Sequence, residues 1–166
     1  MTAPPLHEQG LALQLAFRSA MASVTAPVSV VTAIDNDEPY GTTVSAFASL
    51  SLEPPMILVS LENTSGILEI VRRSGLFGVN ILAAHQADLA LHFARRGGDK
   101  FAGIDWTESE GSPRLPSVTG WVASRVGQMI VAGDHTIITG DVILADSLTG
   151  DPLTYYQRTF GTHAAL

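Results

Sequence analysis

The sequence has 166 residues, of which 46% are hydrophobic and 15% charged, the size and balance of one folded domain rather than a disordered chain. Its formal net charge of −7 argues against a protein that coats nucleic acid, because neutralising phosphates requires a basic surface. The absence of cysteine excludes disulfide frameworks, thiolate metal sites and cysteine nucleophiles, and it agrees with a cytoplasmic location.

Apolar residues with helical spacing begin the chain and predict an amphipathic helix over about residues 7–23. The β-branched segment 27–34 predicts a strand, and the turn-forming residues 35–41 follow it. We expect neither a signal peptide nor a membrane span. Glu8 precedes the first arginine, and the longest uncharged stretch, 19–34, has only 16 residues.

Short strands and two further helices make up the rest of the predicted chain. One helix is expected over about 65–73, where Ser65 can cap the first turn. The other is expected over about 84–96 and stops at Gly97-Gly98. Strand-like runs cover residues 42–47, 56–61, 76–82, 121–131, 135–146 and 153–156.

The order of these elements predicts the fold class. Residues 132–134 form a tight turn between the two long strands, and 97–119 is expected to be a loop. Six or seven strands and three helices do not alternate as βαβ units. We therefore predict a mostly β, antiparallel protein, either a β-barrel with flanking helices or an α+β sheet. Without a linker or a repeat to divide it, the chain is treated as one domain over residues 1–166.

The common catalytic motifs are absent from the sequence, including GxGxxG, GxxxxGK[ST], GxSxG and HExxH. His85, Asp88 and His92 fall on one face of the predicted helix and suggest a metal site. However, the two histidines are separated by about 10 Å of helix rise, whereas one ion needs both nitrogens at about 2 Å. We therefore expect no metal at this position.

Hydroxyl side chains gather in the segment 41–55. In a single strand, one face would carry Thr43, Ser45, Phe47, Ser49 and Ser51. Two interpretations remain open. The segment is either a solvated edge strand or a groove in which small hydroxyls and backbone N–H groups bind a planar, phosphate-bearing ligand.

Lys100 and His135 are the two further candidates for ligand contacts. Lys100 is the only lysine and follows Gly97-Gly98, so it is either a surface charge or a mobile cation that reaches a phosphate. His135 ends the turn Gly133-Asp134-His135. Its imidazole is either structural or positioned to stack on, bond to or exchange a proton with a nucleotide.

Nine short motifs, in this order, resemble those of the short-chain NAD(P)H:flavin oxidoreductases, the reductase partners of two-component flavin-dependent monooxygenases. The motifs are Phe17-Arg18-x-x-Met21, Pro27-Val-x-Val-Val-Thr32, Gly41-x-Thr-x-Ser45, Ser49-x-Ser-x-x-Pro-Pro55, Phe77-x-Val-Asn80, Leu89-Ala-x-x-Phe-Ala94, Lys100-Phe101, Gly133-Asp-His135 and Pro152-Leu-x-Tyr-Tyr156. The resemblance spans about residues 15–160. It departs from the family at Ser124, where cysteine is frequent.

The resemblance implies an FMN-binding split β-barrel of the flavin reductase-like type, a homodimer with flavin near the subunit interface. It implies that NADH or NADPH reduces FMN or FAD, which then diffuses to a partner monooxygenase. Positions that match the family's flavin contacts are Thr42, Thr43, Val44, Ser45, Ser49, Leu50, Ser51, Asn63, Ser65, Asn80, Lys100, Phe101 and Tyr156. Gly133, Asp134 and His135 match its nicotinamide-nucleotide motif, with His135 as the direct contact and the one catalytic candidate.

Three alternatives remain beside this hypothesis. A split-barrel oxidase of the pyridoxamine-phosphate-oxidase type would oxidise its own substrate, but a second phosphate-bearing ligand requires more than one nearby cation. A non-enzymatic flavin carrier or sensor would bind flavin without NAD(P)H turnover, and a purely structural β-domain would leave the ordered motifs unexplained. The choice of FMN or FAD, and of NADH or NADPH, remains open.

Overall fold

Antiparallel strand pairing builds the body of the molecule, which the computed structural model describes over residues 6–165. The largest sheet has seven strands in the order β3-β2-β6-β9-β10-β5-β4, and every neighbouring pair is antiparallel. Its strands are β2 Ser29–Asp35, β3 Glu38–Val44, β4 Phe47–Leu52, β5 Pro55–Glu62, β6 Leu76–Ile81, β9 Gly120–Ala132 and β10 His135–Ser147. The predicted mostly β, antiparallel architecture is confirmed.

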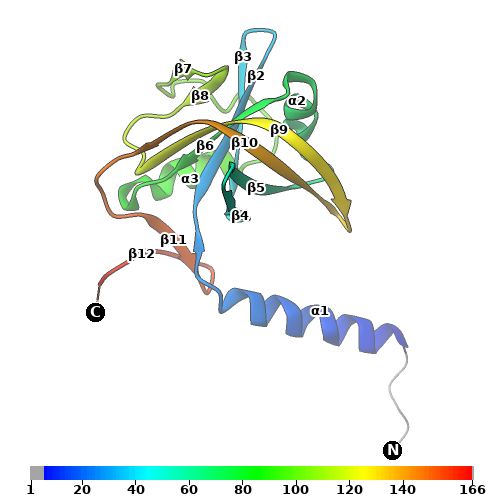
Figure 1. The fold of residues 1–166 in the computed structure, drawn as a ribbon. Coiled ribbons are helices and arrows are strands. Elements are labelled where there is room, and N and C mark those ends of the chain that lie inside the picture. Colours follow the sequence, from blue (N-terminus) through cyan, green and yellow to red (C-terminus); the bar gives the residue numbers. More distant parts are fainter. Residues whose placement is uncertain (1–5, 166) are drawn as a thin grey trace, which may run out of the picture.

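A sharp corner between β3 and β4 gives the sheet its barrel-like form. These strands follow one another in the chain, yet they lie at opposite ends of the sheet. The sheet must therefore curl until its two ends approach each other. The backbone N–H of Ser60 in β5 donates to the carbonyl of Ala46 at this corner, at 2.9 Å. Register shifts in the β9–β10 pairing are irregularities of the kind that bend long strands, and Figure 1 shows both strands curving across the body.

The remaining elements are short strands and helices around this body. The strands are β1 Ala26–Pro27, β7 Thr107–Ser109, β8 Ser112–Arg114, β11 Leu153–Tyr156 and β12 Thr159–Thr162, and the helices are α1 Leu6–Ala22, α2 Gly66–Ser74, the 3₁₀ turn η1 Ala84–Gln86 and α3 Ala87–Ala94. Helix α1 projects away from the body (Figure 1), and its Leu13 and Phe17 side chains are 71% and 62% exposed. Among the described residues, none of the helices has the length and apolar character needed to cross a membrane.

Alternation along β2 divides the core into two clusters. Val31 and Ala33 pack inside the barrel with the apolar side of α2. Val30 of β2, together with Val28 just before the strand, packs on the other face with α3 and the segment that follows it. Because neighbouring residues of a strand point to opposite faces, α2 and α3 cover opposite faces of β2.

The structure corrects the predictions around residues 35–52. Strand β3 begins at Glu38, because the turn needs only Asn36 and Asp37, both at left-handed φ angles of 51° and 65°. The predicted strand 42–47 ends at Val44 and the chain turns the barrel corner. The hydroxyls of 43–51 therefore do not share one strand face, and that prediction is wrong.

Two other segments also differ from the prediction. The expected loop 97–119 contains the β7–β8 hairpin, whose strands of three residues are too short to show periodicity. The expected helix 84–96 begins as the turn η1 and ends at Ala94, where Arg95 turns to an extended conformation. The predicted strand 27–34 is divided into β1 and β2, and β12 was not predicted.

A buried polar network attaches the β7–β8 hairpin to the main sheet. Asn80 in β6 is 0% exposed, and its amide donates to Val30 O, Thr32 Oγ1 and Pro113 O at 3.2–3.3 Å. Its Oδ1 accepts the backbone N–H of Leu115 at 2.7 Å, and Thr32 Oγ1 donates to Pro113 O at 2.6 Å. These bonds replace the water that the buried polar groups lose on folding.

We expect Asn80→Ala to lower the free energy of unfolding by about 2–3 kcal/mol. In the core, the Leu115 N–H would lose its acceptor and the Thr32 hydroxyl oxygen would lose a donor. Urea unfolding of both proteins measures this difference. Ser49→Ala, at an exposed position of β4, is the matched control and should change stability by less than about 0.5 kcal/mol. Equal stability of Asn80→Ala and the unmodified protein would contradict this account.

Candidate functional site

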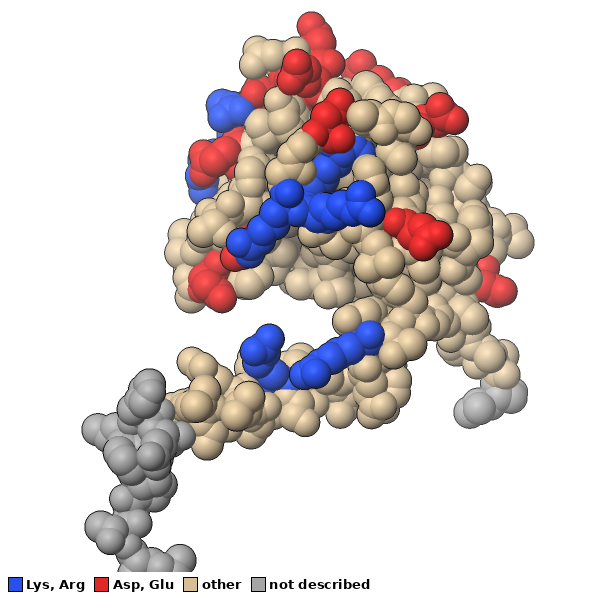
Figure 2. Space-filling view, turned by 180° about the vertical axis from the view of Figure 1, so that it is seen from behind, with Lys and Arg blue, Asp and Glu red and all other residues tan. Residues whose placement is uncertain are grey.

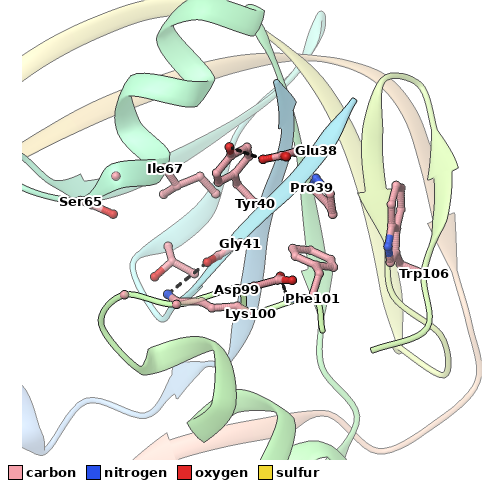
Figure 3. Close-up of a pocket in the computed structure, with 14 residues that line it drawn as sticks. Glu38, Pro39, Tyr40, Gly41, Ser65, Ile67, Asp99, Lys100, Phe101 and Trp106 are labelled. Carbon is pink, nitrogen blue, oxygen red and sulfur yellow. Dashed lines mark hydrogen bonds between the residues drawn. The ribbon is translucent and has the colours of Figure 1, made fainter. Parts of the chain in front are cut away.

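A cleft runs along the free edge of β3 and consists of two adjoining cavities. The His135 cavity, of about 580 Å³, is lined by residues 42–46, the end of β5 and His135. The Trp106 cavity, of about 710 Å³, is lined by residues 38–42, the segment 97–101 and Trp106 (Figure 3). The two cavities share the wall formed by Thr42, Ser65, Gly66, Gly97 and Lys100.

The fold brings many of the predicted ligand-binding residues together on this cleft, although they are far apart in the sequence. Those that line the His135 cavity are Thr42, Thr43, Val44, Ser45, Ser65, Lys100 and His135. Phe101 lines the Trp106 cavity. The structure therefore contains a groove beside Thr42–Ser45, as one of the two interpretations of the hydroxyl segment expected.

The wall beside β3 depends on a close approach between this strand and α3. A Cβ on Gly41 would lie 2.8 Å from the Phe93 ring and 3.3 Å from that of Phe101, so only glycine allows this packing. The hydroxyl of Thr43 donates to Ala90 O in α3 at 2.6 Å. With that side chain engaged, Thr43 offers a ligand its backbone. Strand β3 is the end strand of its sheet, so its outer edge is open to a ligand.

The structure places the Lys100 side chain against β3 and α3, where it is hydrogen-bonded. Its Nζ donates to Phe93 O at 2.8 Å and to Gly41 O at 3.2 Å, and its own carbonyl lies 2.8 Å from His92 Nε2. Two of the three ammonium hydrogens are therefore used, and one is left for a ligand. Burial lowers the pKa of Lys100 because the charged form loses hydration, and an anion in the cleft would offset that loss.

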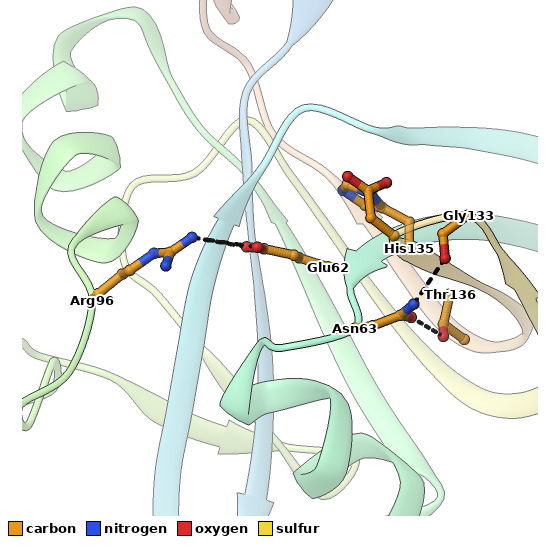
Figure 4. A network of polar contacts seen from close by, with 7 residues as sticks. Glu62, Asn63, Arg96, Gly133, His135 and Thr136 are labelled. Carbon is orange, nitrogen blue, oxygen red and sulfur yellow. Dashed lines mark hydrogen bonds and ion pairs between the residues drawn. The ribbon is translucent and has the colours of Figure 1, made fainter. Parts of the chain in front are cut away.

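Arg95 and Arg96 add two cations that sequence reasoning missed. Both line the His135 cavity, and Nη2 of Arg96 lies 3.3 Å from both carboxylate oxygens of Glu62 (Figure 4). Figure 2 shows basic side chains gathered in a hollow of this face, with acidic side chains around them. In the sequence this pair indicated only the end of a helix. Its position directly before Gly97-Gly98 was the available signal.

His135 lies at the rim of the cleft, oriented by a hydrogen-bonded turn. Its Nδ1 donates to Asp134 Oδ1 at 2.8 Å, which leaves Nε2 as the ring nitrogen for a ligand. That bond, together with the proximity of the imidazole, lowers the pKa of the Asp134 carboxyl. Asn63 Nδ2 donates to Gly133 O at 3.1 Å, and Thr136 Oγ1 donates to Asn63 Oδ1 at 2.7 Å (Figure 4). Asn63 thus holds the turn that presents His135.

Several predicted residues lie elsewhere in the described structure. Those that line neither cavity are Ser49, Leu50, Ser51, Asn63, Asn80, Phe47 and Tyr156. Asn80 is in the core and Tyr156 is exposed on β11. Gly133 and Asp134 also line neither cavity. Asp134 accepts the hydrogen bond of His135 Nδ1, and Gly133 O accepts that of Asn63 Nδ2. Ser65 occupies the N-cap position of α2 without the expected side-chain capping bond, and its hydroxyl instead borders both cavities.

Comparisons with known proteins agree on one family. Residues 21–164 match the model of the flavin reductase like domain. The chain is 38% identical over 145 residues to the reductase component of 4-nitrophenol 4-monooxygenase/4-nitrocatechol 2-monooxygenase of Rhodococcus opacus, covering 87% of this chain and 78% of the relative. It is also 38% identical over 146 residues to FMN reductase (NADH) SmoA of Agrobacterium fabrum, covering 87% and 83%.

Solved structures show the same likeness. The nitrilotriacetate monooxygenase component B homolog of Mycobacterium thermoresistibile superposes with a TM-score of 0.89 at 30% identity, covering 93% of this chain and 89% of that one. The NADH:FAD oxidoreductase SgcE6 of Streptomyces globisporus, solved with NAD and FAD fragments, superposes with a TM-score of 0.86 at 28% identity, covering 91% and 93%.

We expect His135→Ala to raise the pKa of the Asp134 carboxyl toward its ordinary value of 3.8, because the hydrogen bond to its ionised form is lost. Because the pKa of Asp134 is lower in the folded protein than in the unfolded chain, this contact stabilises the fold at pH values above the unfolded-state pKa of Asp134. The stabilisation is lost as the pH falls through the pKa of Asp134 in the folded protein. NMR titration of the side-chain carboxyl measures the change. His85→Ala, outside the cleft, should leave the titration unaltered, and an unchanged midpoint in His135→Ala would refute the contact.

Proposed function

This chain belongs to the flavin reductase-like domain family, and on that premise we propose that it transfers hydride from NADH or NADPH to FMN or FAD. The reduced flavin then passes to a partner monooxygenase, the role that the names of several relatives describe for those proteins. One observation carries the proposal. A single cleft combines the open edge of β3, the cations around Lys100 and the imidazole of His135.

The groups that line the cleft fit a flavin. Small side chains at Thr42, Val44 and Ser45 leave room for a flat ring against β3, and the strand edge offers backbone donors and acceptors. Lys100 has one free ammonium hydrogen and Ser65 a hydroxyl without a capping bond. Both border the wall shared by the cavities, where they suit a phosphate.

When bound, the flavin accepts the hydride that NAD(P)H donates. The residues of this chain have the task of holding two ligands in reactive contact. Backbone groups of β3 would fix the plane of a ring, Lys100 would neutralise a phosphate, and Nε2 of His135 would bond to the nicotinamide nucleotide. Orienting two reactants in this way can lower the activation free energy by about 7 kcal/mol. Such a reaction needs no nucleophile among the side chains of the cleft.

The structure weakens one argument against an oxidase. The sequence suggested a single cation in the site, but Arg95 and Arg96 line the same cavity as Lys100. Three cations would also serve a second phosphate-bearing substrate, so the oxidase remains the second candidate. Turnover in the presence of NAD(P)H separates the two activities.

Homodimerisation in the cytoplasm is part of the proposal. Helix α1 exposes apolar side chains outside the body, namely Leu11, Leu13, Leu15, Phe17 and Met21, and Val24 just after the helix is exposed as well. Val131, near the tip of the β9–β10 hairpin, is 70% exposed. Apolar surface of this extent favours burial against another chain, and a second copy is the partner we propose. The cytoplasmic location is supported by the absence of cysteine and the requirement for NAD(P)H.

NAD(P)H oxidation by the purified protein, without flavin and with FMN or FAD, tests the activity. We expect turnover that saturates with flavin. In His135→Ala we expect the KM for the nicotinamide nucleotide to rise about fivefold to tenfold, the effect of one lost hydrogen bond, with turnover retained. His85→Ala is the matched control. Flavin binding without turnover would favour the carrier, and substrate oxidation without NAD(P)H would favour the oxidase.

Lys100→Met should weaken FMN binding at least about tenfold, because a charge-assisted bond to phosphate is lost. Riboflavin has the same ring without the phosphate, so its dissociation constant should stay the same in this variant. Fluorescence titration with both ligands measures the two effects. An equal loss for riboflavin would mean that Lys100 acts through its bonds to Gly41 and Phe93 and does not bind the phosphate.

A further inference from the structure

We propose that the Trp106 cavity binds the adenosine half of FAD, and that this protein consequently prefers FAD to FMN. The inference rests on the proposed function, since it takes the His135 cavity as the place of the flavin ring. It concerns the Trp106 cavity, the larger part of the cleft. FMN ends at its phosphate and would leave this cavity empty.

The continuity of the cleft supports this assignment. Lys100 and Ser65 belong to the wall that the cavities share, with the His135 cavity on one side and the Trp106 cavity on the other. If the flavin phosphate binds at this wall, the FMN molecule ends there. In FAD the chain continues through a second phosphate to adenosine. The Trp106 cavity, at about 710 Å³, is the adjoining space into which that continuation can extend.

An aromatic wall lines the far side of the Trp106 cavity. Trp106 packs edge-on against Phe101, with ring centroids 5.9 Å apart, and Phe101 packs in the same way against Phe93 at 5.1 Å. Phe93 and Phe101 are buried, so they fix the indole from behind, whereas Trp106 is half-buried. Figure 3 shows Phe101 and Trp106 on one side of β3 and Tyr40 on the other. A fixed, partly exposed indole is a platform on which a purine stacks.

The distribution of charge favours the same orientation. The cations Arg95, Arg96 and Lys100 lie in the His135 cavity or the shared wall. They outnumber the one carboxylate among the described residues there, that of Glu62 beside Arg96. The Trp106 cavity carries the carboxylates of Glu38 and Asp99, and of the residues that the structure describes only the shared Lys100 gives it a cation. Adenosine is uncharged, and its ribose hydroxyls and amino group donate hydrogen bonds that carboxylates accept. A dinucleotide with its phosphates at Lys100 and its adenosine toward Glu38 and Asp99 therefore matches both regions.

NADH also contains adenosine, but its expected position is different. His135, the proposed contact of the nicotinamide nucleotide, lines only the other cavity. We therefore assign the Trp106 cavity to FAD and treat occupation by NADH as a competing outcome.

Dissociation constants of FAD and FMN, measured by fluorescence titration of the full chain, test the inference. We expect the unmodified protein to bind FAD at least about tenfold more tightly than FMN, as one stacked base predicts. Trp106→Leu keeps apolar bulk against Phe101 but removes the aromatic face, so it should abolish this difference and leave FMN binding unchanged. Trp106→Phe retains a ring and should retain most of the difference.

Several results would overturn the inference. Equal affinity for FAD and FMN in the unmodified protein would do so, as would a parallel loss of both ligands in Trp106→Leu, which would make Trp106 a structural support of the cleft. If Trp106→Leu raised the KM for NADH with FMN as acceptor but left FAD binding unchanged, the cavity would be assigned to NADH. Because these dissociation constants require no turnover, they remain decisive even if the NAD(P)H oxidation assay fails.

Discussion

The close approach of α3 and the segment 97–101 to β3 is the contact on which the cleft depends. Gly41 allows it, because a side chain there would collide with Phe93 and Phe101. Once the elements meet, Thr43 donates to the backbone of α3 and Lys100 donates to the carbonyls of Gly41 and Phe93. A strand edge that would otherwise be open to solvent thereby becomes one wall of a pocket with a fixed cation.

The barrel corner decides which hydroxyls can serve a ligand. Residues up to Ala46 line the His135 cavity, and β4 then runs away from the cleft at the far end of the sheet. Antiparallel pairing of β10 with β5 sets His135 opposite Glu62 and brings the β9–β10 hairpin to the end of β5, where Asn63 holds Gly133. Lys100 and His135, which are separated in the chain by residues 101–134, thus line one cavity, the arrangement that two nucleotide ligands in contact require.

The sequence supported the fold class and most of the larger elements. Local periodicity and turn residues predicted the β-branched strand β2, the long pair β9 and β10, and helix α2 to within a few residues. These features are local, because alternation and helical spacing record which side of a segment is buried. The family resemblance implied a flavin contact for Lys100 and a nicotinamide-nucleotide contact for His135, and both residues line the same cavity.

Tertiary structure alone decided which side chains line the cleft and which are used elsewhere. Asn80 and Asn63 look alike as candidate ligand contacts, yet long-range pairing buries one against the β7–β8 hairpin and uses the other to hold a turn. Trp106 has no local pattern that separates it from surface residues, and the only local signal for Arg95 and Arg96 is the glycine pair that follows them. All three become cleft residues because α3 and the following segment dock on β3. Periodicity predicts elements, whereas membership of a cavity depends on contacts between residues distant in sequence, which a single sequence does not encode locally.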